Sequence, residues 1–309
     1  SGLPRMPADY DDRKNFIKSL AMLPLTGSVM KLSALEQVTS SFEETSLMPV
    51  LFVGHGSPMN AIEDNPFSRE MKAIGKKLPK PKAILMISAH WETKGTYVTA
   101  AEKPETIHDF GGFPKELFDT QYPAPGSKWL AEETQKTVTS TSVGLDHKWG
   151  FDHGCWSVTK NLYPNADVPI IQLSLDYTRD AQYHYDLAKQ LFSLRKKGVL
   201  IIGSGNMVHN FGYVAMKPGS QDFNEPFGHA WALEANDTFK KLITANDFKS
   251  LINYKTYSSA LKLSAPTPEH YLPMLYSIAL RDKTDHLSFF NDAAVGGSFS
   301  MTSVVLGKL

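Results

Sequence analysis

The chain has 309 residues, of which 42% are hydrophobic, a normal fraction for one large globular domain or two small ones. Basic and acidic residues balance at 32 each, so a neutral small substrate or a protein partner is expected rather than nucleic acid or an anionic membrane. No apolar segment approaches the roughly 20 residues that a membrane span needs. Cys155 is the only cysteine, which excludes an internal disulfide and leaves histidine and carboxylate as possible metal ligands.

Residues 1–47 differ from the rest, and we predict that they form an N-terminal extension to a single domain spanning 48–309. The extension combines what resembles a tag remnant with a helical or signal-like segment. Residues 12–27 distantly resemble a twin-arginine export signal, but they contain one arginine, and Pro24 and Gly27 interrupt the apolar stretch. An amphipathic helix packed on the domain is the preferred interpretation. We therefore expect a cytoplasmic protein, with export as the alternative.

Residues 48–60 predict a buried strand that delivers one polar side chain to the edge of a sheet. Residues 50–53 are apolar and rich in β-formers, and they run directly into Gly-His-Gly-Ser-Pro. Ligands of open α/β sheets bind beyond the carboxyl ends of the strands, so His55 can approach a metal or a substrate there. We expect its flanking glycines to keep bulk away from the face where substrate enters. A lone histidine in such a place is more often structural, so a metal site requires other histidines that converge on His55.

The next segments repeat this pattern. Residues 66–74 predict a helix, and residues 83–91 form a second continuous apolar strand that ends in His90. We expect this strand to lie beside the first and parallel to it, with both imidazoles at one edge. Residues 95–101 predict a further strand, and residues 107–114 form a glycine-rich aromatic loop that is long enough to make one wall of a pocket.

The middle of the chain predicts alternating helices and strands. Residues 128–138 predict a helix, and another begins with Asp152 as its N-cap and His153 in its first turn. A buried strand over 169–175 and an amphipathic helix over 180–197 follow.

A third apolar strand begins at Gly198 and leads through Gly-Ser-Gly to His209. The glycines do not indicate a dinucleotide site, because the third glycine and the later acidic residue of that fingerprint are missing.

The C-terminal part predicts a helix over 227–245, no clear element over 247–263, and a terminal strand over 300–306. Between them, Thr267 as N-cap and Pro268 at the first helical position predict a helix start. His270 would then lie in the first turn, where the positive end of the helix keeps an imidazole neutral and able to bind a metal.

Four histidines therefore occupy comparable positions, three after strands and one at a helix start: His55, His90, His209 and His270. Each alone is more often structural, but together they favour a metal site, because histidine is the commonest ligand of transition metals. His153 and His108 are further candidates for the same pocket. We assign no site role to the remaining histidines, His147, His184, His229 and His286.

Six short motifs after residue 47 resemble those of one known enzyme family. They are Gly-His-Gly-Ser-Pro at 54–58, Ser-Ala-His-Trp at 88–91, His-Asp-Phe-Gly-Gly-Phe-Pro at 108–114, Gly-Phe-Asp-His-Gly at 150–154, Gly-Asn-Met-Val-His-Asn at 205–210 and Pro-Thr-Pro-Glu-His-Tyr-Leu-Pro at 266–273. In this order they are similar to the class III extradiol ring-cleavage dioxygenases, most closely to the 4,5-DOPA extradiol dioxygenase subfamily. The resemblance covers 48–309 and implies an α/β fold, a three-layer α/β/α sandwich on a mixed, mostly parallel sheet.

The resemblance also implies an activity. Enzymes of this family use a non-haem Fe(II) to open a catechol, such as L-DOPA or a related phenylpropanoid, beside its hydroxyl groups with O₂. It implies that His55 and His90 are ligands, that His209 exchanges protons with the substrate, and that His153 touches substrate or oxygen. We further predict substrate contacts from residues within the motifs: His108, Asp109, Phe110 and Trp91.

The third ligand is open between two neighbours. The wider family uses a glutamate, whereas this subfamily has a Glu-His pair at that place, here Glu269 and His270. Adjacent helical residues point about 100° apart, so one of them reaches the metal, and we favour His270. With His209 as a fourth imidazole, the set could equally form a closed zinc site, and the purified protein could carry zinc. A zinc-dependent hydrolase and a non-enzymatic metal-binding protein are therefore the alternative hypotheses.

Overall fold

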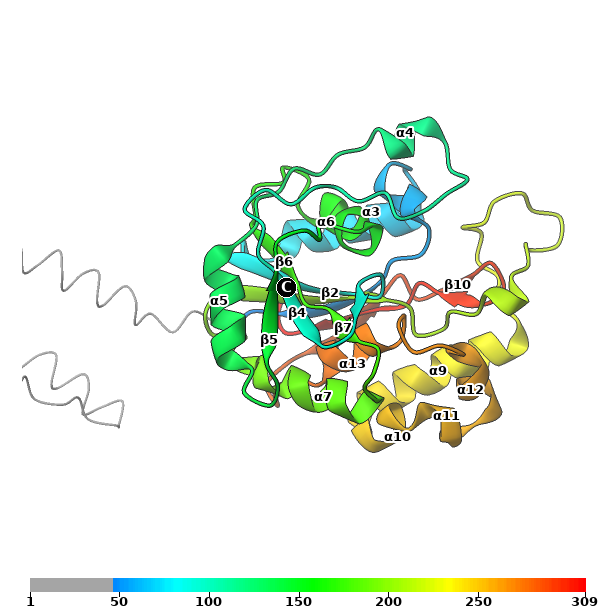
Figure 1. Cartoon of the computed structure of the whole chain (residues 1–309). Coiled ribbons are helices and arrows are strands. Elements are labelled where there is room, and N and C mark those ends of the chain that lie inside the picture. The colour runs from blue at the N-terminus through cyan, green and yellow to red at the C-terminus, as the bar shows by residue number, and fades with distance from the viewer. Residues whose placement is uncertain (1–46) are drawn as a thin grey trace, which may run out of the picture. The chain divides into compact units, whose positions relative to one another are not determined.

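The structure, a computed structural model, describes residues 47–309 and centres on a six-stranded sheet (Figure 1). Its parallel part consists, in spatial order, of β6 (Ile170–Gln172), β2 (Ala83–Ser88), β8 (Val199–Gly205) and β1 (Val50–Gly54). Two antiparallel strands complete the sheet beside β1, namely β12 (Ser303–Leu306) and β9 (Leu287–Phe290). The predicted mixed, mostly parallel sheet is confirmed.

Helices cover both faces of this sheet (Figure 1). One face carries α3 (Pro66–Lys77) and α6 (His153–Leu162), and the other carries α7 (Ala181–Gln190), α9 (Ala230–Thr244) and α13 (Leu272–Ile278). Alternate residues of each central strand belong to two separate apolar cores, one on each side. Strands buried on both faces need apolar side chains at every position, which is why these segments read as continuous apolar runs. The three-layer α/β/α arrangement is confirmed.

Shorter elements surround this core within the described residues. They are η1 (Pro58–Ala61), β3 (Glu92–Thr93), β4 (Thr96–Thr99), α4 (Lys115–Phe118), α5 (Lys128–Thr137), β5 (Val143–Asp146), β7 (Leu175–Asp176), α8 (Phe192–Arg195), η2 (Phe211–Tyr213), α10 (Phe248–Ile252), α11 (Tyr254–Tyr257), α12 (Ser259–Ser264), β10 (Ala294–Val295) and β11 (Phe299–Ser300). Three helices, α10 to α12, thus occupy the segment for which the sequence predicts no clear element. The predicted helix over 180–197 is divided at Leu191 into α7 and α8.

The order of the strands corrects one prediction. β8 lies between β1 and β2, so the strands that precede His55 and His90 are not neighbours. Strand β8 is buried throughout and pairs in parallel with both of them, which local sequence patterns do not reveal. The expectation that matters for the site still holds, because all these parallel strands end at the same edge of the sheet.

The helix predicted to start at Pro268 begins four residues later, at Leu272. A single turn precedes it, in which the amides of Tyr271 and Leu272 both donate to the carbonyl oxygen of Pro268. Pro273 has no amide hydrogen, so it cannot donate the bond to Glu269 that would join this turn to the helix. His270 therefore lies on a turn leading into α13, and its carbonyl oxygen accepts a hydrogen bond from the amide of Asn206 after β8.

Residues Thr45–Leu309 form one compact unit. Most of the predicted N-terminal extension, with its helical or signal-like segment, lies outside the described residues. Among the helices of residues 47–309, none has both the length and the apolar character that crossing a membrane requires.

Candidate metal centre

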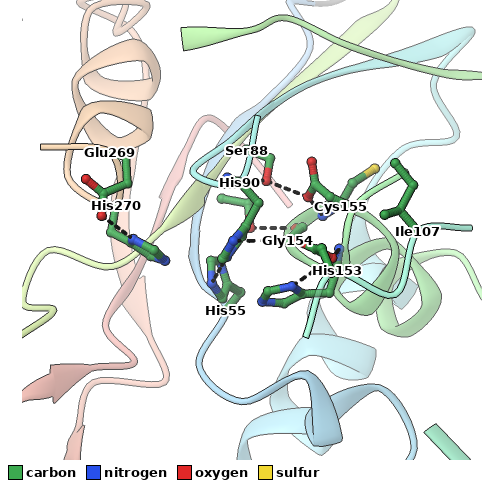
Figure 2. Close-up of polar contacts among 12 residues, drawn as sticks. His55, Ser88, His90, Ile107, His153, Gly154, Cys155, Glu269 and His270 are labelled. Atoms are coloured by element: carbon green, nitrogen blue, oxygen red, sulfur yellow. Dashed lines mark hydrogen bonds and ion pairs between the residues drawn. The ribbon is translucent and has the colours of Figure 1, made fainter. Parts of the chain in front are cut away.

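Three imidazoles from distant parts of the chain meet at the carboxyl edge of the sheet. His55 follows β1, His90 follows β2, and His270 precedes α13. One nitrogen of each ring lies within 4.8 Å of the corresponding nitrogens of the other two, and the Nε2 atoms of His55 and His90 are 3.2 Å apart. Figure 2 shows the rings of His55 and His90 close together and the ring of His270 directed toward them from the opposite side. The structure thus brings together three of the four predicted metal ligands.

The tautomer of His55 follows from its hydrogen bonds. Its Nδ1 lies 3.0 Å from the hydroxyl of Ser204, and that hydroxyl donates its single proton to the carbonyl oxygen of Gly154 at 2.6 Å. Ser204 must therefore accept from His55, which places the proton on Nδ1. The lone pair of His55 is then on Nε2, the atom that faces His90.

Carboxylates face the Nδ1 atoms of the other two rings. Nδ1 of His270 lies 3.3 Å from Oε1 of Glu269, and Nδ1 of His90 lies 3.6 Å from Oδ2 of Asp109. A carboxylate favours the tautomer with its proton on the facing nitrogen, which leaves Nε2 free to bind a metal. Glu269 also accepts a hydrogen bond from the Thr267 hydroxyl, and it does not belong to the group formed with His55 and His90.

Burial keeps these imidazoles neutral. It lowers the pKa of His55 and of His270 well below the ordinary value, and neighbouring histidines lower both further. Burial, followed by the nearby His153, lowers the pKa of His90 to about 3. The sequence predicts that the positive end of a helix keeps His270 neutral, but burial is the largest cause of its lowered pKa.

These observations fit a bound divalent cation. Three neutral rings that carry protons on Nδ1 direct three nitrogen lone pairs toward one another in a buried space. Lone pairs at 3.2 Å have no proton between them, so they repel each other unless a cation lies among them. Three imidazoles without a thiolate suit both Fe(II) and Zn(II), and a three-ligand set leaves further coordination positions open.

His209, predicted as a fourth ligand or as a base, lies beside this group. Its ring stacks on that of His270, with centroids 3.5 Å apart and planes 7° from parallel. It groups with Glu269 and His270, but not with His55 and His90. Burial lowers the pKa of His209 to about 4, so the ring is neutral and able to accept a proton at pH 7.

Asp109 connects a second histidine to the cluster. Its Oδ1 accepts a hydrogen bond from the backbone amide of His153 at 2.8 Å and lies 3.0 Å from Nδ1 of that ring. The Nδ1 atom is buried and has no well-directed hydrogen-bond partner within the described residues. Burial alone would raise the pKa of Asp109, but His153 and His90 lower it below its ordinary value. Asp152 caps α6 as predicted, accepting from the amide of Cys155, so that His153 enters the helix at its first position.

A pocket of about 650 Å³ opens directly onto these side chains. It is lined by the five histidines described above and by aromatic and polar residues from several elements, including Asp109, Phe110, Phe113, Phe211, Phe223 and Phe299. Two of the four predicted substrate-binding residues, Asp109 and Phe110, are therefore in the right place. The aromatic loop makes one wall, as the sequence predicted.

The other two predicted substrate-binding residues, His108 and Trp91, are not among the residues that line this pocket. His108 points away, and its Nε2 donates to the carbonyl oxygen of Thr120 at 2.8 Å. Trp91 is buried and stacks on Trp149, with centroids 5.9 Å apart. Both side chains hold the surrounding loops rather than face the cavity.

The remaining histidines have the ordinary roles expected of them. His147 and His286 are exposed, and His229 donates to the carbonyl oxygen of Tyr213. His184 is fully buried between Tyr276 and the backbone of Asp176.

The glycines beside His55 pack closely against a distant segment of the chain. A Cβ on Gly54 would meet the backbone of Met301 at 2.7 Å, and one on Gly56 would meet its sulfur at 2.4 Å. Gly56 also has a φ of 60°, which favours glycine. The close approach of Met301 therefore favours glycine at both positions, and Gly56 also lines the pocket.

Sequence reasoning missed the far wall of the pocket. Phe299 belongs to β11 and Phe223 to a loop before α9, and neither segment contains a motif or a clear periodicity. Phe211, three-quarters exposed beside the pocket, directly follows the Val-His-Asn segment that drew attention to His209. The position of Phe211 next to the segment that contains His209 was the one feature of the sequence that could have indicated this wall.

Comparisons with known proteins agree with this geometry. The family described as "Catalytic LigB subunit of aromatic ring-opening dioxygenase" matches residues 49–282. The chain is 44% identical to "4,5-DOPA dioxygenase extradiol" of Escherichia coli (strain K12) and 35% identical to the protein of the same name in Beta vulgaris. Each match covers 84% of this chain, together with 95% of the bacterial and 97% of the plant relative.

A solved structure shows the same fold. The crystal structure of an uncharacterized protein from Escherichia coli K12 superposes with a TM-score of 0.70 at 38% identity, covering 84% of this chain and all of the other. The family model and the named relatives thus agree with the ring-opening enzyme family that the six motifs predict. We conclude that this chain belongs to the family of the catalytic LigB subunit of aromatic ring-opening dioxygenases and is an extradiol dioxygenase.

Proposed function

We propose that this enzyme uses Fe(II), held by His55, His90 and His270, to open the ring of a catechol such as L-DOPA with O₂. The observation that carries the proposal is the convergence on one pocket of three neutral imidazoles, of which two are buried and His90 is partly buried. The printed names of the relatives support L-DOPA as the first substrate to try. Zinc fits the same three nitrogens, so protein purified in air is expected to contain some zinc.

The metal would supply the redox chemistry, since Fe(II) can bind catecholate and oxygen together and pass electron density between them. The side chains of this chain do the remaining work. The aromatic walls, which include Phe110 and Phe299, suit a planar ring.

His209 is the proposed acid and base. It lies beside the ligand His270 but outside the three-ligand group, and it is neutral at pH 7. It can therefore take a proton from a catechol hydroxyl and later return it to the product, while the three ligands stay in place. His153, fixed at the start of α6 and facing the same pocket, is proposed to contact the substrate or oxygen.

An anaerobic reconstitution tests the proposal. The apoprotein is loaded with Fe(II) without air, L-DOPA or another catechol is added, and oxygen is then admitted. We expect a yellow ring-fission product and matching oxygen consumption, with no product from zinc-loaded protein. If no catechol in the panel gives a product, the dioxygenase proposal fails. Zinc-dependent hydrolysis of esters or amides that is insensitive to oxygen would support the hydrolase alternative instead.

A further inference from the structure

We propose that Glu63 and Asp222 make this pocket select catechols whose side chain carries a positive charge and reject those with only a carboxylate. The inference rests on the proposed function, because it assumes that a catechol binds in this pocket. Among the described residues, the lining contains three carboxylates, from Glu63, Asp109 and Asp222, and no lysine or arginine. Burial lowers the pKa of four histidines that line it, His55, His90, His209 and His270, so these four do not replace a cation.

Glu63 is held in place without being neutralised. It follows η1, and its backbone amide donates to the carbonyl oxygen of Met59 at 2.8 Å. Its Oε2 accepts long hydrogen bonds from the side-chain amides of Asn65 at 3.4 Å and Asn224 at 3.3 Å. Neutral amides at these distances orient a carboxylate but leave its charge in place. Within residues 47–309 it forms no ion pair.

Asp222 lies on the same wall. Its Oδ1 accepts a hydrogen bond from the backbone amide of Asn224 at 2.8 Å, and the side chain of Asn224 donates to Glu63. One residue therefore joins the two carboxylates. Asp222 also has no basic partner in the described part of the chain, whereas Glu225 in the same loop pairs with Lys217. Glu225, which lies outside the pocket lining, is therefore paired, whereas Asp222, which lines the pocket, has no basic partner among the described residues.

This acidic wall is separate from the metal ligands. The carboxylate of Glu63 accepts from Asn65 and Asn224, that of Asp222 accepts from the backbone amide of Asn224, and none of these hydrogen bonds involves a histidine. His153, whose Nδ1 lies 3.0 Å from Oδ1 of Asp109, also lines this pocket and is not in contact with the acidic wall. A catechol whose hydroxyl groups reach the imidazoles would extend its side chain into the rest of the pocket, where this wall lies.

The charges determine which side chain is favoured. An ammonium group beside two unpaired carboxylates gains charge-assisted hydrogen bonds, and partial exclusion of water strengthens them. A carboxylate in that position would be repelled and would find no basic residue among the described lining residues. The side chain of L-DOPA carries both an ammonium and a carboxylate group. We therefore expect L-DOPA to bind more weakly than a catechol with only an ammonium group and more tightly than one with only a carboxylate.

Binding measurements test this without requiring turnover. The metal-loaded full chain is titrated under anaerobic conditions with dopamine, L-DOPA, 4-methylcatechol and 3,4-dihydroxyphenylpropionate, and the Kd of each is measured by calorimetry. We expect dopamine to bind most tightly and the propionate most weakly. Equal Kd values for the four ligands, or tightest binding of the propionate, would overturn the proposal.

Two variants test whether Glu63 and Asp222 cause the difference in affinity. Glu63→Gln and Asp222→Asn each keep the size of the side chain, and each should raise the Kd of dopamine by about tenfold, the usual effect of losing one charge-assisted hydrogen bond. The Kd of 4-methylcatechol should not change. Asp64→Asn is the matched control, because Asp64 neighbours Glu63 but pairs with Arg69 and is absent from the pocket lining. If this control weakens dopamine binding as much as Glu63→Gln does, the effect is general electrostatics and the assignment is wrong.

The outcome is separable from that of the proposed function. Charge-selective binding without ring opening would keep this inference and remove the dioxygenase proposal. Ring opening of all four catechols with equal kcat/KM and equal Kd would support the dioxygenase proposal and overturn the inference of charge selection.

Discussion

Single hydrogen bonds decide what each imidazole of the cluster can do. Ser204 has one proton and donates it to the carbonyl oxygen of Gly154, so it can only accept from His55. This small side chain on β8 thereby leaves Nε2 of His55 available to a metal. Asp109 and Glu269 have the same effect on His90 and His270 through their negative charge.

The first prediction at this scale separates proton transfer from metal binding. In His209→Ala the three-ligand group remains, so the metal content should be unchanged, while ring cleavage should fall by about 10² to 10⁴-fold because the proton acceptor is lost. Metal analysis of the loaded protein and the ring-fission absorbance measure the two effects. Loss of metal together with activity would show that His209 is a fourth ligand.

The second prediction concerns the third ligand. His270→Ala removes a nitrogen donor and should abolish tight metal binding, whereas Glu269→Gln keeps the ring and should weaken binding by about 10 to 100-fold at most. A competition titration against a metal-binding dye gives both affinities. If Glu269→Gln loses the metal and His270→Ala keeps it, the ligand assignment must be reversed.

At the scale of elements, the site depends on how closely β8 and α13 approach each other. A Cβ on Gly203 would meet the carbonyl oxygen of Pro273 at 2.2 Å, and one on Gly205 would meet that of His270 at 2.1 Å. The Gly-Ser-Gly segment that superficially resembles a nucleotide-binding loop is therefore a packing surface. Its glycines allow the turn that carries His270 to lie directly against the end of the strand.

Gly205→Ala tests this contact. The added methyl group must push the His270 turn outward, so we expect a loss of about 1–3 kcal/mol of unfolding free energy and weaker metal binding. Gly111→Ala is the matched control, because nothing lies within 4 Å of its Cβ position. Urea denaturation of both variants, with and without metal, makes the comparison. Equal stability of the two would contradict the proposed packing role.

At the scale of the whole molecule, buried neutral histidines couple stability to acid. His184 is in the core, where its Nε2 donates to the carbonyl oxygen of Asp176 and its Nδ1 accepts from the hydroxyl of Tyr276. Burial lowers the pKa of His184 to about 4. The pKa values of His90 and His209 are lowered in the same direction.

These shifts predict acid sensitivity of the apoprotein. An unfolded histidine takes up a proton near pH 6.5, whereas the folded His184 does so only near pH 4, so protons favour the unfolded state. Stability should be complete above pH 6.5 and should decline as the pH falls toward 4, with His184 accounting for about 3 kcal/mol of the loss. Urea titrations of the apoprotein between pH 7.5 and 4.5 measure this. His184→Gln, which keeps a donor and an acceptor but does not titrate, should show a smaller decline, and an identical one would exclude His184 as the cause.

Local sequence patterns were enough to predict the fold class, the family and the histidines that meet in the pocket. These depend on local patterns, namely continuous apolar runs that stop at a polar residue, and on motifs in a fixed order. His55, His90, His153, His209 and His270 could be singled out because each directly follows or precedes a recognisable element.

Tertiary structure alone decided the details that depend on contacts between distant segments. The insertion of β8 between two strands, the approach of Met301 to the glycines beside His55, and the separation of His108 from the pocket all arise from packing partners far away in the chain. The same is true of the acidic wall, in which Glu63 and Asp222 are joined through Asn224. Periodicity reports which way a side chain faces, but not which other segment it will face, so these relations became visible only in the folded protein.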